Sequence, residues 1–150
     1  DWLPDVTPSS GLKAVEARDK DRNAGLNKAV EEMQTLADDA ARLYREGKAK
    51  EAAAALDGLL EKARKAGLIS EFFLGVFAYN FQSSEDERMY FAILEKNVEL
   101  FPNSFTACEL LASVYASRGK TKLALVYFRK VLELDPGNRN ASKMIKELQK

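Results

Sequence analysis

Two stretches of similar sequence each carry a proline, and the prolines lie 34 residues apart, a spacing that constrains the fold more than any other feature. They are EKNVELFPNS, with Pro102, and RKVLELDPGN, with Pro136. A fixed period of this length is the signature of a repeated supersecondary unit. Because one such unit cannot bury its apolar face alone, neighbouring units are expected to stack into a solenoid.

Apolar residues follow helical spacing from Leu26 onward, and no stretch shows the alternation of a strand. A first helix is predicted from Leu26 to Gly47. A second is predicted from about Ala49 to Ala66, where Gly67 ends it, and the two form a hairpin. Further helices are predicted over residues 70–83, from 84 to just before 102, and over 104–118, 122–134 and 141–150. The predicted fold class is therefore all-α, with about three hairpins in an α-solenoid and a capping helix within residues 139–150.

The start of the fourth predicted helix has a recognisable signal. Ser84 is followed three positions later by Glu87, which is the spacing of a capping box. Ser84 is therefore predicted to cap this helix.

Residues 1–25 show little apolar periodicity and contain Pro4, Pro8 and a mixed-charge run. They are predicted to form an arm, a linker or a short first helix, whereas residues 26–150 form the repeat domain. The chain begins with Asp1 rather than methionine, so it is expected to be a processed protein or part of a longer one. A cytoplasmic and an exported location both stay open.

Composition argues against several classes of function. Lys plus Arg and Asp plus Glu both number 23, so no basic surface for nucleic acid is expected. There is no histidine, the commonest general base and metal ligand. No apolar run is long enough to cross a bilayer, and the single cysteine, Cys108, has no intrachain disulfide partner.

Residues Gly119, Lys120 and Thr121 have the order that ends a phosphate-binding P-loop. That motif also needs a glycine five residues earlier, and Val114 stands there within a predicted helix. Gly119 is better explained as a left-handed residue just past a helix end, and Gly47 repeats the arrangement in the first hairpin. A nucleotide site is therefore not predicted.

Two further patterns have a chemical interpretation and a simpler one. Ser10 and Lys13 have the Ser-x-x-Lys spacing of penicillin-recognising enzymes, but the sheet of that fold is not predicted, so Ser10 is expected to cap a helix. A solvated helix face explains the acidic cluster better than a metal site does; the cluster comprises Glu31, Glu32, Asp38 and Asp39. No catalytic, cofactor-binding or metal-binding residue is assigned.

The 34-residue unit resembles the tetratricopeptide repeat, a helix-turn-helix with small and large apolar residues at fixed positions. The match is strongest over residues 105–138, degenerate but in phase over 71–104, and partial over 33–66. The positions that carry it are Gly47 and Ala52 in the first unit and Leu111, Ala112, Tyr115, Gly119, Ala124, Phe128 and Pro136 in the third. Small residues are expected where helix axes come closest, with large ones beside them.

The last third of the chain also resembles the tetratricopeptide tail behind the catalytic domain of many bacterial esterases and serine β-lactamase-like hydrolases. The residues that suggest it are Asn97, Val98, Pro102 and Ser104. This likeness implies an accessory domain without its enzyme. In the repeat family, Cys108 stands where a large apolar residue faces the neighbouring helix, so a buried, inert thiol is expected, with a reactive thiolate near a helix start as the alternative.

The family resemblance implies a concave groove lined by the first helix of each hairpin. The implied positions are Gln34, Ala37, Ala41, Tyr44 and Arg45, then Phe72, Gly75, Tyr79, Gln82 and Ser83, then Thr106, Glu109, Ser113, Ala116 and Ser117. The partner is predicted to contact Tyr44, Arg45, Phe72, Tyr79, Gln82, Thr106, Glu109 and Ser113. Ala37 and Ala41 replace the lysine and asparagine that clamp a chaperone tail in this family, so that function is not expected.

The segment ISEFFLGVFAYNF, residues 69–81, is apolar around about two thirds of its helical circumference and must be buried on more than one side. Neighbouring repeats are expected to bury Leu74, Phe77, Ala78 and Phe81, which leaves Phe72 and Tyr79 facing the groove. Either the chain's own N-terminal segment or first helix covers these two, or a peptide, a second subunit or a catalytic domain does.

The sequence therefore predicts a non-enzymatic interaction module that binds a protein or peptide. The alternatives are a structural C-terminal domain of a larger bacterial hydrolase and a homodimerisation module. An enzyme in its own right would need carboxylates or lysines to act without histidine.

Overall fold

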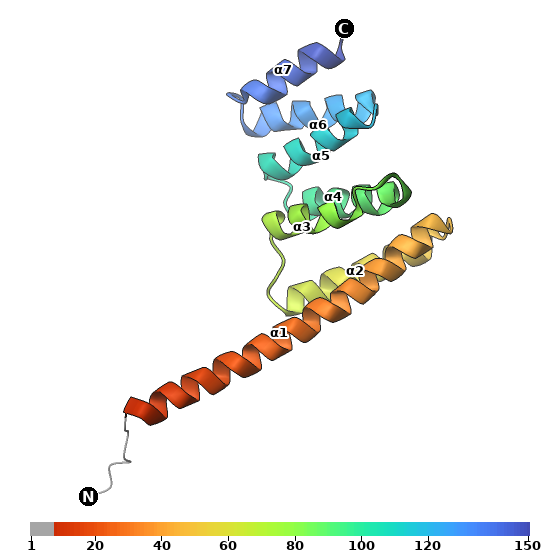
Figure 1. Ribbon diagram of the computed structural model, residues 1–150. Helices are drawn as coiled ribbons and strands as arrows, with labels where there is room; N and C mark the ends of the chain where they lie inside the picture. The colour runs from red at the N-terminus through yellow and green to blue at the C-terminus, as the bar shows by residue number, and fades with distance from the viewer. Residues whose placement is uncertain (1–7) are drawn as a thin grey trace, which may run out of the picture.

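The computed structural model describes residues 8–150, with side chains from Ala17 onward. Within this range the chain is all-helical and has no strand (Figure 1), which confirms the all-α part of the predicted fold class. The α-helices are α1 (Pro8–Arg45), α2 (Ala49–Lys65), α3 (Glu71–Ala78), α4 (Glu87–Leu100), α5 (Phe105–Ser117), α6 (Thr121–Leu134) and α7 (Arg139–Leu148). Two short 3-10 helices, η1 (Tyr79–Phe81) and η2 (Ser84–Asp86), link α3 to α4.

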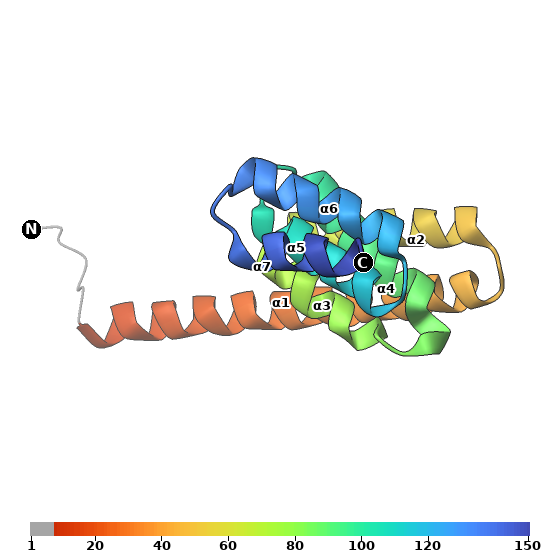
Figure 2. The same ribbon diagram turned by 90° about the horizontal axis from the view of Figure 1, so that it is seen from above.

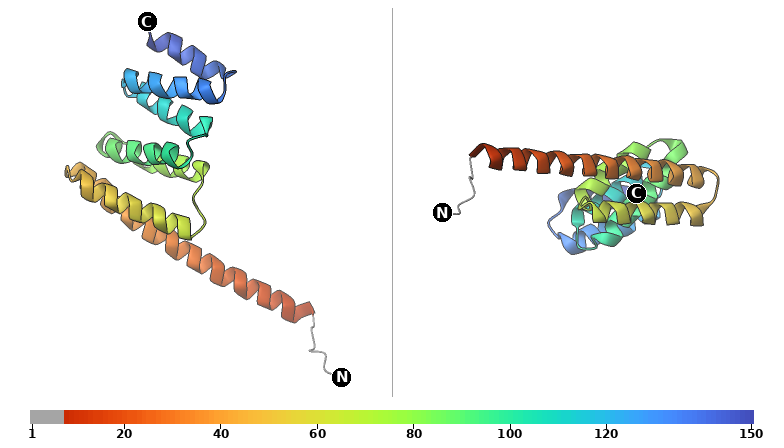
Figure 3. Two further views of the ribbon diagram at one scale, coloured as in Figure 1. Left: turned by 180° about the vertical axis from the view of Figure 1, so that it is seen from behind. Right: turned by 90° about the horizontal axis from the view of Figure 1, so that it is seen from below.

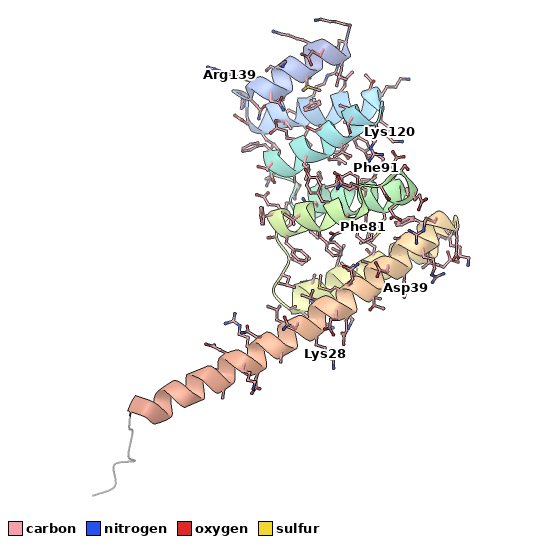
Figure 4. All side chains as sticks on the ribbon, viewed as in Figure 1. Lys28, Asp39, Phe81, Phe91, Lys120 and Arg139 are labelled. Carbon is pink, nitrogen blue, oxygen red and sulfur yellow. The ribbon has the colours of Figure 1, made fainter. Side chains whose placement is uncertain are left out.

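The helices form antiparallel pairs that follow one another along the chain (Figures 1 and 3). Helix α1 packs on α2, α3 on α4 and α5 on α6, and α7 packs on α6 at the C-terminal end. Contacts of α1 with α4, and of α3 and α4 with α5, join each pair to the next. Side chains fill the spaces between the pairs (Figure 4), and Phe91 of α4 stacks on Tyr115 of α5 with ring centroids 4.9 Å apart.

Glycines in the left-handed conformation follow helices α1, α2 and α5. Gly47, Gly67 and Gly119 have φ values of 75°, 70° and 70°, which residues with a Cβ adopt only at a cost. After α5 the N–H of Lys120 bonds to the carbonyl of Tyr115 (2.9 Å), and equivalent bonds close α1 and α2. The left-handed turns predicted at Gly47 and Gly119 are confirmed.

Helix α1 is longer than the apolar pattern predicts. It begins at Pro8, so the predicted helix start at Leu26 is not a boundary, and Ser10 lies inside the helix rather than at a cap position. Residues 17–28 are all exposed, because this part of α1 extends beyond the other helices (Figure 2). A helical segment without a packing partner needs no apolar stripe, which is why helical spacing missed it.

The link between α3 and α4 also departs from the prediction. The helix predicted over residues 70–83 ends as an α-helix at Ala78 and continues as η1. Ser84 does not cap α4, because Asp86 occupies the cap position and makes no side-chain bond to the helix N-terminus. The Asp86 carboxylate instead forms an ion pair with Arg45 of α1. A tertiary contact thus takes the place of the predicted local cap.

Small and large residues pack together where α5 meets α6. Ala112 and Ala124 are fully buried, and Tyr115 and Phe128 are buried beside them. The Tyr115 hydroxyl donates a hydrogen bond to Glu95 Oε1 of α4 (2.8 Å), and burial is the main reason that the pKa of this hydroxyl is raised. These contacts fix α5 against α6 on one side and α4 on the other.

Candidate functional site

The residues predicted to line a groove differ in their accessibility. Ala37, Ala41 and Gly75 are buried, so their side chains cannot contact a partner. Tyr44, Glu109 and Ala116 are half-buried. The exposed members are Gln34, Arg45, Phe72, Tyr79, Gln82, Ser83, Thr106, Ser113 and Ser117.

Several predicted partner contacts are already engaged inside the chain. Arg88 lies over the ring of Tyr44, and Arg45 forms an ion pair with Asp86. The carbonyl of Gln82 accepts a hydrogen bond from Arg118, and the carboxylate of Glu109 accepts one from Asn140. All four contacts join different helices or links, so they hold the stack together. Their role in binding a partner stays a prediction.

Three exposed large apolar side chains lie along one face of α3 and η1, and Phe72 is the most exposed of those in the described residues. Phe72 is 78% exposed, Val76 52% and Tyr79 50%. The three are spaced by four and three residues, which places them in one row on a helix. This row, Phe72, Val76 and Tyr79, is called the apolar stripe below. Val76 was missed at the sequence level, although its spacing from Phe72 was a signal that could have found it.

Within the described residues, the chain does not cover the apolar stripe. Helix α1 leaves these side chains exposed, so the hypothesis that the first helix covers Phe72 and Tyr79 is wrong. The other part of that hypothesis concerns the N-terminal segment, whose residues 1–7 lie outside the described part of the chain.

The opposite side of α3 packs into the core. Leu74, Ala78 and Phe81 are buried, as predicted, and Phe77 is half-buried. The Phe77 ring stacks on Phe73 with centroids 5.7 Å apart. Helix α3 is therefore held firmly from one side and presents the apolar stripe on the other.

A hollow of about 290 Å³ lies beside the stripe, between α3 and α5. It is lined by Glu71, Phe72, Gly75, Val76, Tyr79, Asn97, Thr106, Ala107 and Leu110. Gly75 lets the two helices approach, because a Cβ at this position would lie 3.2 Å from Leu110 Cδ2. Of the predicted partner contacts, the structure brings Phe72, Tyr79 and Thr106 together here, whereas Ser113 does not line the hollow.

Asn97 of α4 is the polar residue buried beneath this region, with 1% of its surface exposed. Its Nδ2 donates a hydrogen bond to the carbonyl of Glu71, the first residue of α3, at 3.0 Å. Its Oδ1 is buried and has no hydrogen-bond partner in the described structure. An unpaired buried acceptor is uncommon and calls for an explanation. The sequence offered no signal for it beyond a polar residue on the apolar side of a helix.

The lining of the hollow is mostly uncharged. Glu71 is the one lining residue with a charged side chain, and its carboxylate is at the exposed start of α3. The other lining groups are apolar or carry a neutral hydroxyl or amide. Recognition here would therefore rest on shape, apolar contact and hydrogen bonding.

The candidate metal, thiol and phosphate sites considered from the sequence are not formed in the described residues. No group of three or more His, Cys, Asp or Glu is placed to hold a metal in this part of the chain. Cys108 is fully buried, and burial raises the pKa of its thiol, which disfavours the reactive thiolate. Val114 lies within α5, so the backbone before Gly119 cannot wrap a phosphate.

Among the helices described here, none is both long and apolar enough to cross a membrane.

The chain was compared with known proteins. Neither a scan against models of protein families nor a search of curated proteins finds a match.

Proposed function

We propose that the chain is a tetratricopeptide-like interaction module that binds a peptide or protein partner through the apolar stripe and the adjoining hollow. The observation that carries this proposal is the exposure of Phe72, Val76 and Tyr79 in one row on a helix whose other side is fixed in the core. Contiguous exposed apolar patches rimmed by polar residues mark interaction sites in soluble proteins.

Burial of the two aromatic side chains by a partner would contribute substantially to the binding free energy. Burying the exposed parts of Phe72 and Tyr79 contributes roughly 2 to 5 kcal/mol at the usual value per buried area. That is a typical hot-spot contribution, and aromatic residues are common at such positions. The polar group of Thr106 at the site is suited to fix orientation rather than to supply affinity.

Two features support the tetratricopeptide-like part of the proposal. The glycine turns at Gly47 and Gly119 close the first and third helix pairs with the same hydrogen bonds. Small residues at Ala52, Ala112 and Ala124 are fully buried between paired helices. Gly47 and Ala52 stand at the same positions within the unit 33–66 as Gly119 and Ala124 do within the unit 105–138.

Peptide selection tests the proposed function directly. Peptides selected from a random library on the wild-type protein are expected to lose binding to a Phe72→Ala/Tyr79→Ala variant. A matched control is Leu123→Ala/Val126→Ala on α6, because these residues are also exposed and line no part of the hollow. Equal binding to the wild type and the Phe72→Ala/Tyr79→Ala variant would overturn the assignment.

A second candidate function is homodimerisation through α1. Leu26 and Val30 are 36% and 47% exposed on this helix, and Leu26 borders a hollow of about 500 Å³ between α1 and the end of α2. A concentration-dependent dimer in sedimentation measurements, abolished by Leu26→Asp/Val30→Asp, would support it. A monomer at all accessible concentrations would reject it.

A further inference from the structure

We infer that the hollow between α3 and α5 binds a tryptophan side chain of the partner, with the indole N–H donated to Asn97 Oδ1. The inference rests on the proposed function, because it names the chemistry of the group that the site recognises. The inference can fail while the proposed function holds, because a groove that binds peptides without tryptophan would satisfy the proposed function alone.

The unpaired oxygen of Asn97 defines the hydrogen-bonding partner. Oδ1 can only accept a hydrogen bond, so the missing group is an N–H or O–H donor. The amide cannot be turned to solve the problem, because that would replace the bond from Nδ2 to the Glu71 carbonyl by two facing oxygens. A ligand that donates to Oδ1 therefore gives this buried acceptor a hydrogen-bond partner.

The lining of the hollow narrows the choice of donor. Phe72, Val76 and Leu110 present apolar surface, so a charged lysine or arginine head group would be poorly solvated there. Tryptophan is the side chain with a large apolar body, one donor and no acceptor. A hollow of about 290 Å³ is at the small end of ligand sites, which suits one side chain better than a larger ligand.

The area of the apolar stripe argues against a second copy of the chain as the occupant. From typical side-chain areas, the exposed parts of Phe72, Val76 and Tyr79 amount to roughly 300 to 400 Å². A stable interface buries about 800 Å² on each partner. The stripe is therefore too small to hold two protomers together and large enough to hold a short peptide segment.

Small-molecule probes test the inference without a known partner. Indole carries the ring and the N–H donor, whereas 1-methylindole keeps the ring and lacks the donor. Oδ1 is shielded from solvent, so a probe that reaches it must shift a lining side chain and change the surroundings of the Asn97 amide. In a titration followed by ¹H–¹⁵N NMR, indole is expected to move the Asn97 side-chain and Gly75 backbone signals, and 1-methylindole to bind about 10-fold more weakly.

Two glycines supply a matched pair of variants. Gly75→Ala places a methyl group 3.2 Å from Leu110 Cδ2, whereas Gly58→Ala in α2 has nothing within 4 Å. Both changes raise helix propensity, so both proteins are expected to fold. Gly75→Ala is expected to weaken indole binding about 5-fold or more, because the added methyl group takes space in the hollow, whereas Gly58→Ala leaves indole binding unchanged.

A third variant, Asn97→Leu, removes the acceptor oxygen. In this variant, indole and 1-methylindole are expected to bind with equal affinity.

Each other outcome contradicts the inference in a defined way. Equal binding of indole and 1-methylindole to the wild type, or shifts that fall outside α3, α4 and α5, would overturn it. Absence of indole binding, with selected peptides still dependent on Phe72, would overturn the inference and leave the proposed function standing. Trp2 is the one tryptophan of the chain. Self-association that Trp2→Ala abolishes would overturn the inference of a separate partner, because a second copy of the chain would then occupy the hollow. If Asn97→Leu does not fold, the comparison of indole with 1-methylindole on the wild type still tests the hydrogen bond, and the glycine pair still tests the place of binding.

Discussion

The α5–α6 pair and the α3–α4 pair are both antiparallel helix pairs in one stack, yet they are packed by different rules. In α5–α6, fully buried Ala112 and Ala124 lie beside Tyr115 and Phe128, and the Tyr115 hydroxyl is hydrogen-bonded to Glu95 of α4. In α3–α4, one face of α3 is exposed and apolar, its end tightens into a 3-10 helix, and Asn97 keeps an unpaired oxygen. The α3–α4 pair thus departs from the packing of α5–α6 in three ways, and we propose that binding rather than stability explains these departures.

Removing a large side chain from the regular pair is expected to have the largest effect. Phe128 is fully buried in α6, and Phe128→Ala should lower the free energy of unfolding by about 3 to 5 kcal/mol. Urea unfolding followed by circular dichroism measures this. A loss below about 1 kcal/mol would mean that α6 contributes far less to the stack than its packing indicates.

The second largest effect is expected at alkaline pH, where ionisation of Tyr115 lowers the free energy of unfolding. Burial raises the pKa of Tyr115 in the folded chain, so the unfolded chain releases this proton first. The stabilisation is present below about pH 10 and is lost as the pH rises above that value, by up to about 1.4 kcal/mol per pH unit. Urea unfolding from pH 8 to 11 should show a shallower decline for Tyr115→Phe than for the wild type. Parallel declines would contradict the prediction.

Glycine substitutions separate a turn from a helix interior. Gly119→Ala forces a Cβ into a conformation with φ of 70° and should cost about 1 kcal/mol of stability. Gly58→Ala is the matched control within α2, where nothing lies within 4 Å, and it should stabilise the protein by about 0.5 to 1 kcal/mol. Thermal unfolding of both variants is expected to shift in opposite directions, and a shift in the same direction would be evidence against the turn assignment.

Changes in the apolar stripe are expected to affect stability least. Phe72 and Tyr79 are largely exposed, so Phe72→Ala/Tyr79→Ala should change the free energy of unfolding by less than about 1 kcal/mol. The same variant should lose most of its peptide binding. A loss of several kcal/mol of stability would instead make these side chains part of the core, and the contrast between the two pairs would fail.

The regular part of this architecture could be predicted from the sequence because its signals are local. The helical spacing of apolar residues located α2, α5 and α6 closely, and the glycines located their turns. Phe72 and Tyr79 could be identified as facing out because the helix around them has more apolar surface than its neighbours can cover.

The remaining features depend on contacts between distant residues. The sequence placed the start of α4 at Ser84 and missed the ion pair of Asp86 with Arg45, which is far away in the sequence. The hollow depends on Gly75 facing Leu110 of another helix, and the unpaired Asn97 oxygen depends on the approach of α3 to α4. No sequence pattern within one helix predicts these contacts between helices, so they are seen only in the packed structure.

The most direct test of the account is to map where a selected peptide binds. Peptide is titrated into the ¹⁵N-labelled protein, and shifts of the backbone amides are followed by NMR. If the partner binds at the apolar stripe, the largest shifts are expected at Phe72, Gly75, Val76 and Leu110, on the two helices that border the hollow. Shifts centred on the exposed residues of α6, such as Leu123 and Val126, with little change along α3, would contradict it.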